Sequence, residues 1–269
     1  MEKTDSGYSL SEKPIAFLAL FIPAAYFFKS RFKDFSTFIF HACYEWLPGA
    51  FCIYSFSKYS YTEAAFAYFN GFLAFIALYE IGYFVNDYYA VKKESNPRLR
   101  VSNFHLADEW EVLLLITARV LFFFGLLYFT SIGSLTFLFF CFLLCVVFAV
   151  HNFLQVPGLK FLTFIGLALF RFLLPLIPFV HLKQLQVLLP AILVNYVLYR
   201  MINYMESKGI LQIPNRKAGW YKFSFYLLLL PVNLFVSVVF ESNFPFWLNL
   251  YFLAFWSIYF LKSKYFSPA

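Results

Sequence analysis

Residues 63–89 read EAAFAYFNGFLAFIALYEIGYFVNDYY, and this stretch decides the fold class. Between Glu63 and Glu80 the stretch holds no charged residue and is rich in Phe, Tyr, Ala and Leu. About 20 apolar residues are enough for an α-helix to cross the hydrocarbon core of a bilayer. We therefore predict a membrane-spanning helix that carries two carboxylates, Glu80 and Asp87, toward one of its ends.

The composition of the whole chain agrees with this prediction. Of 269 residues, 62% are apolar, 25% are aromatic and only 13% are charged. Soluble domains are about 45–50% apolar and about 25% charged. This composition excludes a soluble enzyme, a disordered chain and a nucleic-acid-binding protein. The alternating pattern of a transmembrane β-barrel is missing as well. The sequence therefore predicts an all-α, polytopic transmembrane helical bundle.

Eight apolar runs are long enough to span. They lie at residues 36–57, 63–89, 110–129, 134–154, 161–180, 184–205, 223–240 and 243–261. A ninth run, Pro14 to Phe28, is shorter and precedes Lys29, Arg31 and Lys33, which favours an interfacial helix and leaves a ninth span open. We expect a polar N-terminus with this short helix at 1–35, one transmembrane domain at 36–262, and a cytoplasmic tail at 263–269.

The loops differ in charge from one side to the other. The loops at 29–35, 90–109, 155–160 and 206–222, together with the C-terminal end, carry 14 Lys and Arg residues, whereas the opposite loops carry 2. The positive-inside rule places the basic set in the cytoplasm. We therefore attribute the formal net charge of +7 to loops that lie beside anionic lipid headgroups, and not to the binding of nucleic acid. We expect a multi-pass protein of a bacterial inner membrane, with its functional loops on the cytoplasmic side.

Ionisable groups at membrane depth are costly and mark candidate sites. Glu80, Tyr83 and Asp87 are spaced to share one helical stripe, with Asn86 close to it. The run at 184–205 ends in a second polar group: Asn195, Tyr199, Arg200, Asn203, Tyr204 and Glu206, followed by Lys208. Carboxylate and amide oxygens suit Mg²⁺ together with a phosphate, and Lys and Arg suit the remaining phosphate charge. The two helix ends therefore predict a site for a magnesium-bound diphosphate.

Simpler interpretations stay open. Basic residues beside spans are often topology signals, and a carboxylate at a helix end is often merely a solvated cap. Glu45, Arg119 and Arg171 lie deeper in their apolar runs. For these three residues, a buried structural ion pair and a catalytic role are equally compatible with the sequence.

Two segments carry a resemblance to a known family. YFVNDYYAVKKESNPRLR, residues 83–100, resembles the NDxxDxxxD motif of the UbiA-type intramembrane prenyltransferases. Asn86 and Asp87 match its opening pair, Ala90 stands at the second Asp, and Glu94 stands at the last. RMINYMESKG, residues 200–209, is similar to the second acidic motif but keeps only the carboxylate of Glu206.

The resemblance implies a helical bundle around a central cavity and a Mg²⁺-dependent enzyme of isoprenoid metabolism. That enzyme would transfer a prenyl group from a polyprenyl diphosphate to an acceptor, and it would belong to the transferases of alkyl or aryl groups other than methyl. The implied metal ligands are Asn86, Asp87, Glu94, Asn203 and Glu206, and the implied catalytic residues are Asp87, Arg98, Arg100, Arg200 and Lys208. Tyr83, Arg171 and Tyr204 would bind substrate. Arg171 is similar to an Arg that family members carry between the two motifs.

Departures from the motifs leave alternatives. Ala90, and a second motif with only one carboxylate, remove Mg²⁺ ligands. The site could then hold one metal ion instead of two, with Lys or Arg supplying the missing positive charge. Alternatively, the protein could be inactive or use a different donor. The ESNPRLR and NYMESK segments also resemble the polyprenyl-phosphate phosphoribosyltransferases, in which phosphoribosyl diphosphate is the donor. A non-catalytic lipid-binding protein is the third reading. A transporter fits poorly, because paired broken repeats are not visible.

Overall fold

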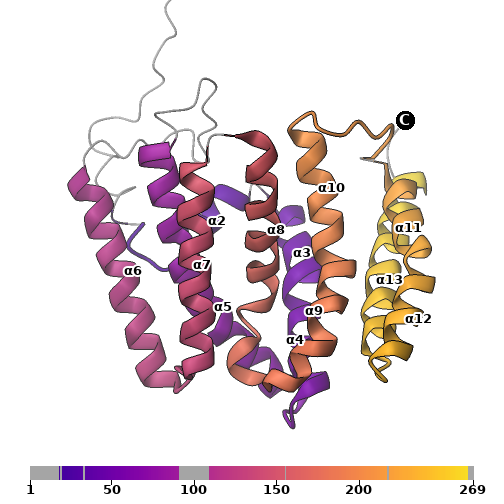
Figure 1. Ribbon diagram of the computed structural model, residues 1–269, viewed down its shortest axis with the longest axis horizontal. Helices are drawn as coiled ribbons and strands as arrows, with labels where there is room; N and C mark the ends of the chain where they lie inside the picture. Colours follow the sequence, from indigo (N-terminus) through magenta and orange to yellow (C-terminus); the bar gives the residue numbers. More distant parts are fainter. Residues whose placement is uncertain are drawn as a thin grey trace, which may run out of the picture.

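The computed structural model describes residue 18 and residues 20–32, 34–90, 109–154, 156–216 and 218–265. Over these residues the chain is helical, and none of them forms a β-strand. The long helices lie roughly parallel, from α6 and α7 at one side of the view to α11–α13 at the other (Figure 1), and α5 packs against α4, α6 and α7. The predicted all-α helical bundle is therefore confirmed.

The helices match six of the eight predicted apolar runs, whereas the run at 36–57 is divided among three short helices and the helix in the run at 161–180 ends at Leu173. In chain order they are α2 (Ala25–Arg31), α3 (Phe35–His41), η1 (Ala42–Trp46), α4 (Leu47–Phe56), α5 (Tyr61–Val85), η2 (Asn86–Ala90), α6 (Glu109–Thr130), α7 (Leu135–Phe153), α8 (Pro157–Leu173), η4 (Ile177–Phe179), η5 (Leu182–Gln184), α9 (Leu185–Ile192), η6 (Leu193–Val197), α10 (Leu198–Ser207), α11 (Gly219–Leu228), α12 (Leu230–Val239) and α13 (Phe244–Tyr265). Among the described residues, six helical segments are long and apolar enough to cross a membrane: Tyr61–Tyr89, Glu109–Thr130, Leu135–Phe153, Leu182–Ser207, Gly219–Val239 and Phe244–Leu261. The protein therefore has the make-up of a multi-pass membrane protein.

Local sequence signals set where the helices begin. Ser60 starts α5 with a capping box, in which its hydroxyl accepts from the N–H of Glu63 and the Glu63 carboxylate accepts from the N–H of Ser60. Ser134 caps α7 through the N–H of Phe137 at 3.1 Å. Asp34 caps α3 through Thr37, and these hydrogen bonds to its carboxylate lower the pKa of Asp34.

Helix α5 is the central helix of the bundle. In its most apolar window 61% of residues are buried, against 17–44% in the other five candidate spans. It packs against α4, α6 and α7. At Gly71 a Cβ would lie 2.1 Å from the carbonyl oxygen of Pro175, so only glycine allows the turn after α8 to lie this close to α5. The polar residues of α5 are thereby held inside the bundle.

The segment before α3 is inserted beside α5. Ala24 has a left-handed backbone with φ of 68°, and the seven-residue helix α2 follows it. The Glu80 carboxylate accepts the backbone N–H groups of Ala24 at 3.2 Å and Phe27 at 2.7 Å. Arg119 donates to that carboxylate at 2.5 Å. It also donates to three consecutive backbone carbonyls at 2.5–3.1 Å, those of Leu20, Phe21 and Ile22. Non-helical backbone at membrane depth is tolerated where such partners satisfy it.

The run at Pro14–Phe28 lies partly outside the described residues, and its interfacial or spanning character stays a prediction. Within it, the Glu80–Arg119 pair holds the backbone from Leu20 to Phe27, while the side chains of Leu18 and Ile22 are exposed. The sequence predicts that Glu80 shares one helical stripe with Tyr83 and Asp87, but its carboxylate is not available as an oxygen ligand, because it is 0% exposed and bound by Arg119 and by two backbone N–H groups.

Neutral polar contacts attach the C-terminal helices. Asn195, on the π-helical turn η6, exchanges side-chain hydrogen bonds with Asn233 of α12 at 2.7 and 3.2 Å. Asn249 of α13 donates to Asn195 at 3.0 Å, and the Tyr226 hydroxyl of α11 donates to its backbone carbonyl at 2.9 Å. Three helices are thus attached to one asparagine without any buried charge.

We expect Arg119→Met to destabilise the fold strongly. The substitution leaves Glu80 as an unpaired buried carboxylate and removes the donors to three carbonyls, which should cost about 3–5 kcal/mol of unfolding free energy. Denaturant unfolding of the detergent-solubilised protein measures the loss, and the exposed Lys183→Met is the control. A variant as stable as the control would contradict this account of the N-terminal segment.

Candidate functional site

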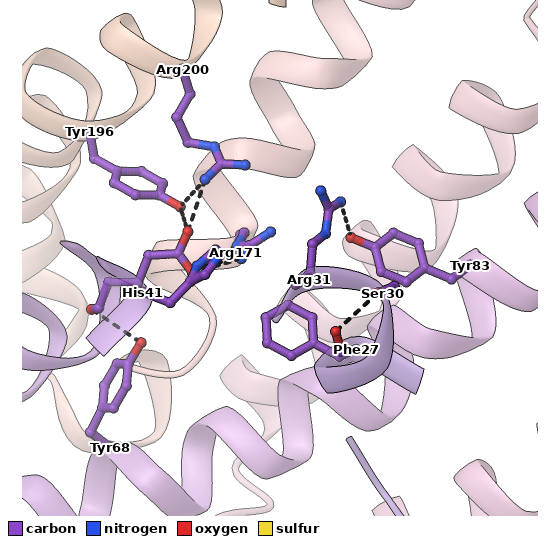
Figure 2. A network of polar contacts seen from close by, with 10 residues as sticks. Phe27, Ser30, Arg31, His41, Tyr68, Tyr83, Arg171, Tyr196 and Arg200 are labelled. Carbon is purple, nitrogen blue, oxygen red and sulfur yellow. Dashed lines mark hydrogen bonds and ion pairs between the residues drawn. The ribbon is translucent and has the colours of Figure 1, made fainter. Parts of the chain in front are cut away.

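A second buried carboxylate, Glu45, contacts polar side chains from four helical elements. Arg171 of α8 donates to its Oε2 from Nε at 3.0 Å and from Nη2 at 2.7 Å, a two-nitrogen contact (Figure 2). Arg200 of α10 and the hydroxyl of Tyr196 donate to Oε1 at 2.9 and 2.8 Å. His41 Nδ1 lies 3.3 Å from Oε2. Glu45 and Arg171 are 3% and 4% exposed, whereas the Arg200 side chain is 21% exposed, so the group is buried at Glu45 and reaches water at Arg200.

Local structure aims these side chains at one point. Glu45 lies in the π-helical turn η1 between α3 and α4, where one extra residue per turn changes side-chain direction. Tyr196 lies in the π-helical turn η6, one helical turn before Arg200. The guanidinium of Arg171 lies 5.2 Å from the ring centroid of Phe27, which adds a cation–π contact from α2.

A third guanidinium comes from α2. Arg31 donates from Nη2 to the hydroxyl of Tyr83 at 2.7 Å. Figure 2 shows Arg31, Arg171 and Arg200 extending toward one another from three helices. Tyr79, one turn before Tyr83, interacts electrostatically with all three arginines, which agrees with the picture. We call Arg31, Arg171 and Arg200 the arginine cluster.

The arginine cluster carries more positive charge than its surroundings neutralise. Among the described residues, Glu45 is one carboxylate shared by Arg171 and Arg200, and Arg31 binds a neutral tyrosine hydroxyl. The buried Nε atoms of Arg31 and Arg200 also have no hydrogen-bond partner among the described residues. Buried charges are normally paired because desolvation is costly. The arrangement therefore suits an anionic ligand that brings the missing negative charge.

Asp87 lies close to the arginine cluster on the same helix as Tyr83. Its carboxylate accepts from the hydroxyl of Tyr26 in α2 and from Asn86 Nδ2 at 2.8 Å. The rings of Tyr26 and Tyr83 are 6.0 Å apart. Helix α2 therefore contacts both the predicted metal ligand Asp87, through Tyr26, and the arginine cluster, through Arg31.

The polar end of α10 forms a separate group. Arg216, in the segment before α11, donates from Nε to Glu206 and from Nη1 to Asn203. Tyr204 stacks on Phe164 of α8 at 4.1 Å, and Lys208 lies over the Tyr204 ring at 5.9 Å. Both α5 and α10 end at the upper end of the bundle in Figure 1, as the motifs require.

The predicted site residues are thus placed in part. Arg171 and Arg200 meet at Glu45, and Tyr83 binds Arg31, while Asn86 and Asp87 contact each other. Asn203 and Glu206 meet at Arg216, and Tyr204 and Lys208 form a stacked pair. Glu94, Arg98 and Arg100 lie outside the described residues.

Sequence reasoning missed Arg31, His41 and Arg216 as site residues. Arg31 and Arg216 each lie in a basic loop segment, and basic residues there are explained by the positive-inside rule alone. One signal was available for Arg31. It lies one turn after the buried Phe27, whereas the neighbouring Lys29 is exposed, so the periodicity of α2 separates the two.

A magnesium ion fits the described residues only in part. Across the described ranges, no group of three His, Cys, Asp or Glu side chains is positioned to hold a metal ion. Asn86 and Asp87 offer a carboxylate and an amide oxygen, to which the predicted ligand Glu94 would add. Asn203 and Glu206 are already engaged by Arg216.

Comparisons of the chain with protein-family models, curated proteins and solved structures found no match. Function must therefore be inferred from the side chains themselves.

We expect inorganic diphosphate to stabilise the purified protein against heat, because a ligand that binds only the folded state adds to its stability. Arg200→Met and Arg31→Met should each weaken diphosphate binding at least about tenfold, the effect of losing 1.4 kcal/mol. Arg200→Lys should keep part of it, since lysine keeps the charge but not the planar fork. Thermal-shift titration checks this, with Lys183→Met as control; equal shifts in all variants would contradict the assignment.

Glu45→Gln should act in the opposite direction. Removing this carboxylate frees Arg171 and Arg200 from their internal partner, so the ligand-free protein should be less stable and diphosphate should bind more tightly. The same titration measures both effects. Weaker diphosphate binding than in the wild type would show that Glu45 holds the arginines in a binding geometry instead of competing with the ligand.

Proposed function

We propose that the protein is an integral membrane transferase of the UbiA type, which transfers a prenyl group from a polyprenyl diphosphate to an acceptor. The observation that carries the proposal is the arginine cluster, in which Arg171 and Arg200 bind Glu45 and Arg31 binds Tyr83 on the helix that leads to Asp87. Over the described residues the three guanidiniums outnumber the carboxylates that contact them, and this supports an anionic ligand. In a bundle of membrane-spanning helices, a lipid diphosphate can deliver that anion from the bilayer.

The arginine cluster suits a diphosphate leaving group. Guanidiniums form planar, two-point hydrogen bonds with phosphate oxygens. When the bond between the prenyl C1 and the bridging oxygen breaks, the electron pair leaves with the diphosphate. Cations fixed in place before the reaction stabilise this developing negative charge. Arg31, Arg171 and Arg200 would hold the diphosphate in this way, and the acceptor would attack the allylic carbon.

The remaining side chains of the site have complementary roles in this proposal. Mg²⁺ bound by Asn86, Asp87 and Glu94 would neutralise further charge on the diphosphate. Tyr79 and Tyr83 lie beside the arginine cluster and present aromatic faces that can steady a carbocation. We place Arg98 and Arg100 at the phosphate as well, on the resemblance of their segment to the family motif.

The proposal includes topology and location. We propose eight or nine spans around a central cavity, with the ends of α5 and α10 at the cytoplasmic face of a bacterial inner membrane. The excess of Lys and Arg in the loops on that side supports the orientation. The oxygen-rich ends of both helices at one end of the bundle agree with it.

Transfer of label from radioactive geranylgeranyl diphosphate to membrane acceptors, with release of diphosphate, tests the proposal. We expect turnover by membranes that contain the wild type and a loss of at least about 100-fold, or 2.7 kcal/mol of transition-state stabilisation, in Arg200→Met and Asp87→Asn. Lys183→Met should keep its activity. Full turnover in Asp87→Asn and Arg200→Met would refute the site.

A parallel reaction separates the alternatives. Labelled phosphoribosyl diphosphate with a polyprenyl phosphate would give a lipid-linked sugar phosphate if the donor is the sugar. Lipid bound by the protein without product from either donor would favour a non-catalytic lipid-binding protein.

A further inference from the structure

We infer that Arg216 supplies, in the second polar group, the positive charge that a metal ion would otherwise bring. The inference rests on the proposed function and concerns the end of α10. It assigns a guanidinium, not a second Mg²⁺, to the oxygens of Asn203 and Glu206. The anionic substrate would then meet a metal on the α5 side and an arginine on the α10 side.

The contacts of Arg216 carry the first step. Asn203 and Glu206 are three residues apart on α10, so their side chains lie on the same face. Both direct an oxygen at the same guanidinium, Glu206 at Nε and Asn203 at Nη1. The side chains of Arg216 and Glu206 are 14% and 25% exposed, so the pair is well removed from water. The two predicted metal ligands therefore already share one cation.

The chain between α10 and α11 is shaped to bring Arg216 back to α10. Asn215 has φ of 58°, a left-handed conformation that asparagine tolerates better than most residues. The N–H of Ala218 donates to the Asn215 carbonyl at 2.8 Å and closes a tight turn around Arg216. The preceding Pro214 restricts the same turn. The position of Arg216 is thus set by the backbone as well as by its ion pair.

The surrounding charge disfavours a second metal ion. Besides Glu206, the described groups that interact with Arg216 are Asn203, Tyr199, Tyr221 and the cationic Lys222. The one carboxylate of this group is already paired with Arg216, and Lys222 adds a second positive charge nearby, over the rings of Trp256 and Tyr259 at 4.6 Å. Mg²⁺ prefers several oxygen ligands with more than one carboxylate or phosphate among them. A divalent ion added here would meet like charge and too few ligands.

Arg216 keeps donors for a ligand. A guanidinium has five N–H groups. Glu206, Asn203 and Tyr199 account for three interactions, which leaves donors for phosphate oxygens. The second polar group can therefore bind an anion directly.

Metal binding by the full-length protein in detergent, measured with Mn²⁺ by electron paramagnetic resonance in the presence of inorganic diphosphate, tests the inference. We expect at most one Mn²⁺ per chain. Glu206→Gln should change the Mn²⁺ dissociation constant less than twofold, whereas Asp87→Asn should raise it at least tenfold. Two Mn²⁺ per chain, or a tenfold loss in Glu206→Gln, would overturn the inference.

Removal of the arginine gives the converse test. Arg216→Ala should weaken diphosphate binding about tenfold, and millimolar Mg²⁺ should restore it, because the oxygens of Asn203 and Glu206 become free for a metal. Arg200→Met is the matched control. It also loses a guanidinium, but the carboxylate that it leaves, Glu45, is still bound by Arg171 and Tyr196, so Mg²⁺ should not rescue it. Equal rescue of both variants, or of neither, would overturn the inference.

These outcomes are separate from those of the proposed function. A wild-type protein that binds no diphosphate removes the proposed function and the inference with it. A protein that binds diphosphate through the arginine cluster but needs Glu206 for metal keeps the proposed function and loses only the inference. Size-exclusion profiles of each variant confirm that a loss of binding is not a loss of fold.

Discussion

A charged side chain buried in this bundle needs a partner within the protein, because lipid cannot stabilise the charge. The two buried carboxylates of the described structure, Glu80 and Glu45, differ in how they are paired. Glu80 is fully matched, by one arginine and two backbone N–H groups. Glu45 is overmatched, by two arginines and a tyrosine. The first arrangement is complete without a ligand, and the second is not. The same electrostatic rule therefore separates the part of the molecule that holds the fold from the part that can bind.

The two arrangements are connected through the inserted N-terminal segment. Arg119 and Glu80 fix the turn before α2, and this places Tyr26 against Asp87 and Arg31 against Tyr83. A structural ion pair thereby positions two side chains of the candidate site. Loss of the Glu80–Arg119 pair would thus change ligand binding indirectly. It would shift α2, and with it Tyr26 and Arg31, without changing the charge of the site itself.

The helices could be predicted from the sequence because apolar length and capping residues are local signals. Ser60 with Glu63 and the apolar run that follows identify α5 without any knowledge of its neighbours. The inserted segment could not be predicted in this way. The hydrophobicity of Pro14–Phe28 indicates an apolar environment but not whether the chain crosses it, and the residue that binds its backbone, Arg119, is remote in sequence. Arg171 and Arg200 were identified as site residues, but their meeting point at Glu45 depends on two π-helical turns, which no periodicity reveals.

Whether arginine or a metal ion supplies the positive charge depends on how many anionic oxygens the protein offers as metal ligands. A metal needs several anionic oxygens from the protein, and each of them must be desolvated before the ion arrives. An arginine needs one carboxylate to hold it and keeps donors for the substrate. In a sequence with Ala90 in its first motif and a single carboxylate in its second, the number of carboxylates is low and the number of arginines near the site is high. If the protein acts on a diphosphate as proposed, guanidiniums would contribute more to binding its phosphate groups than metal would, and binding would depend less on the concentration of divalent ions.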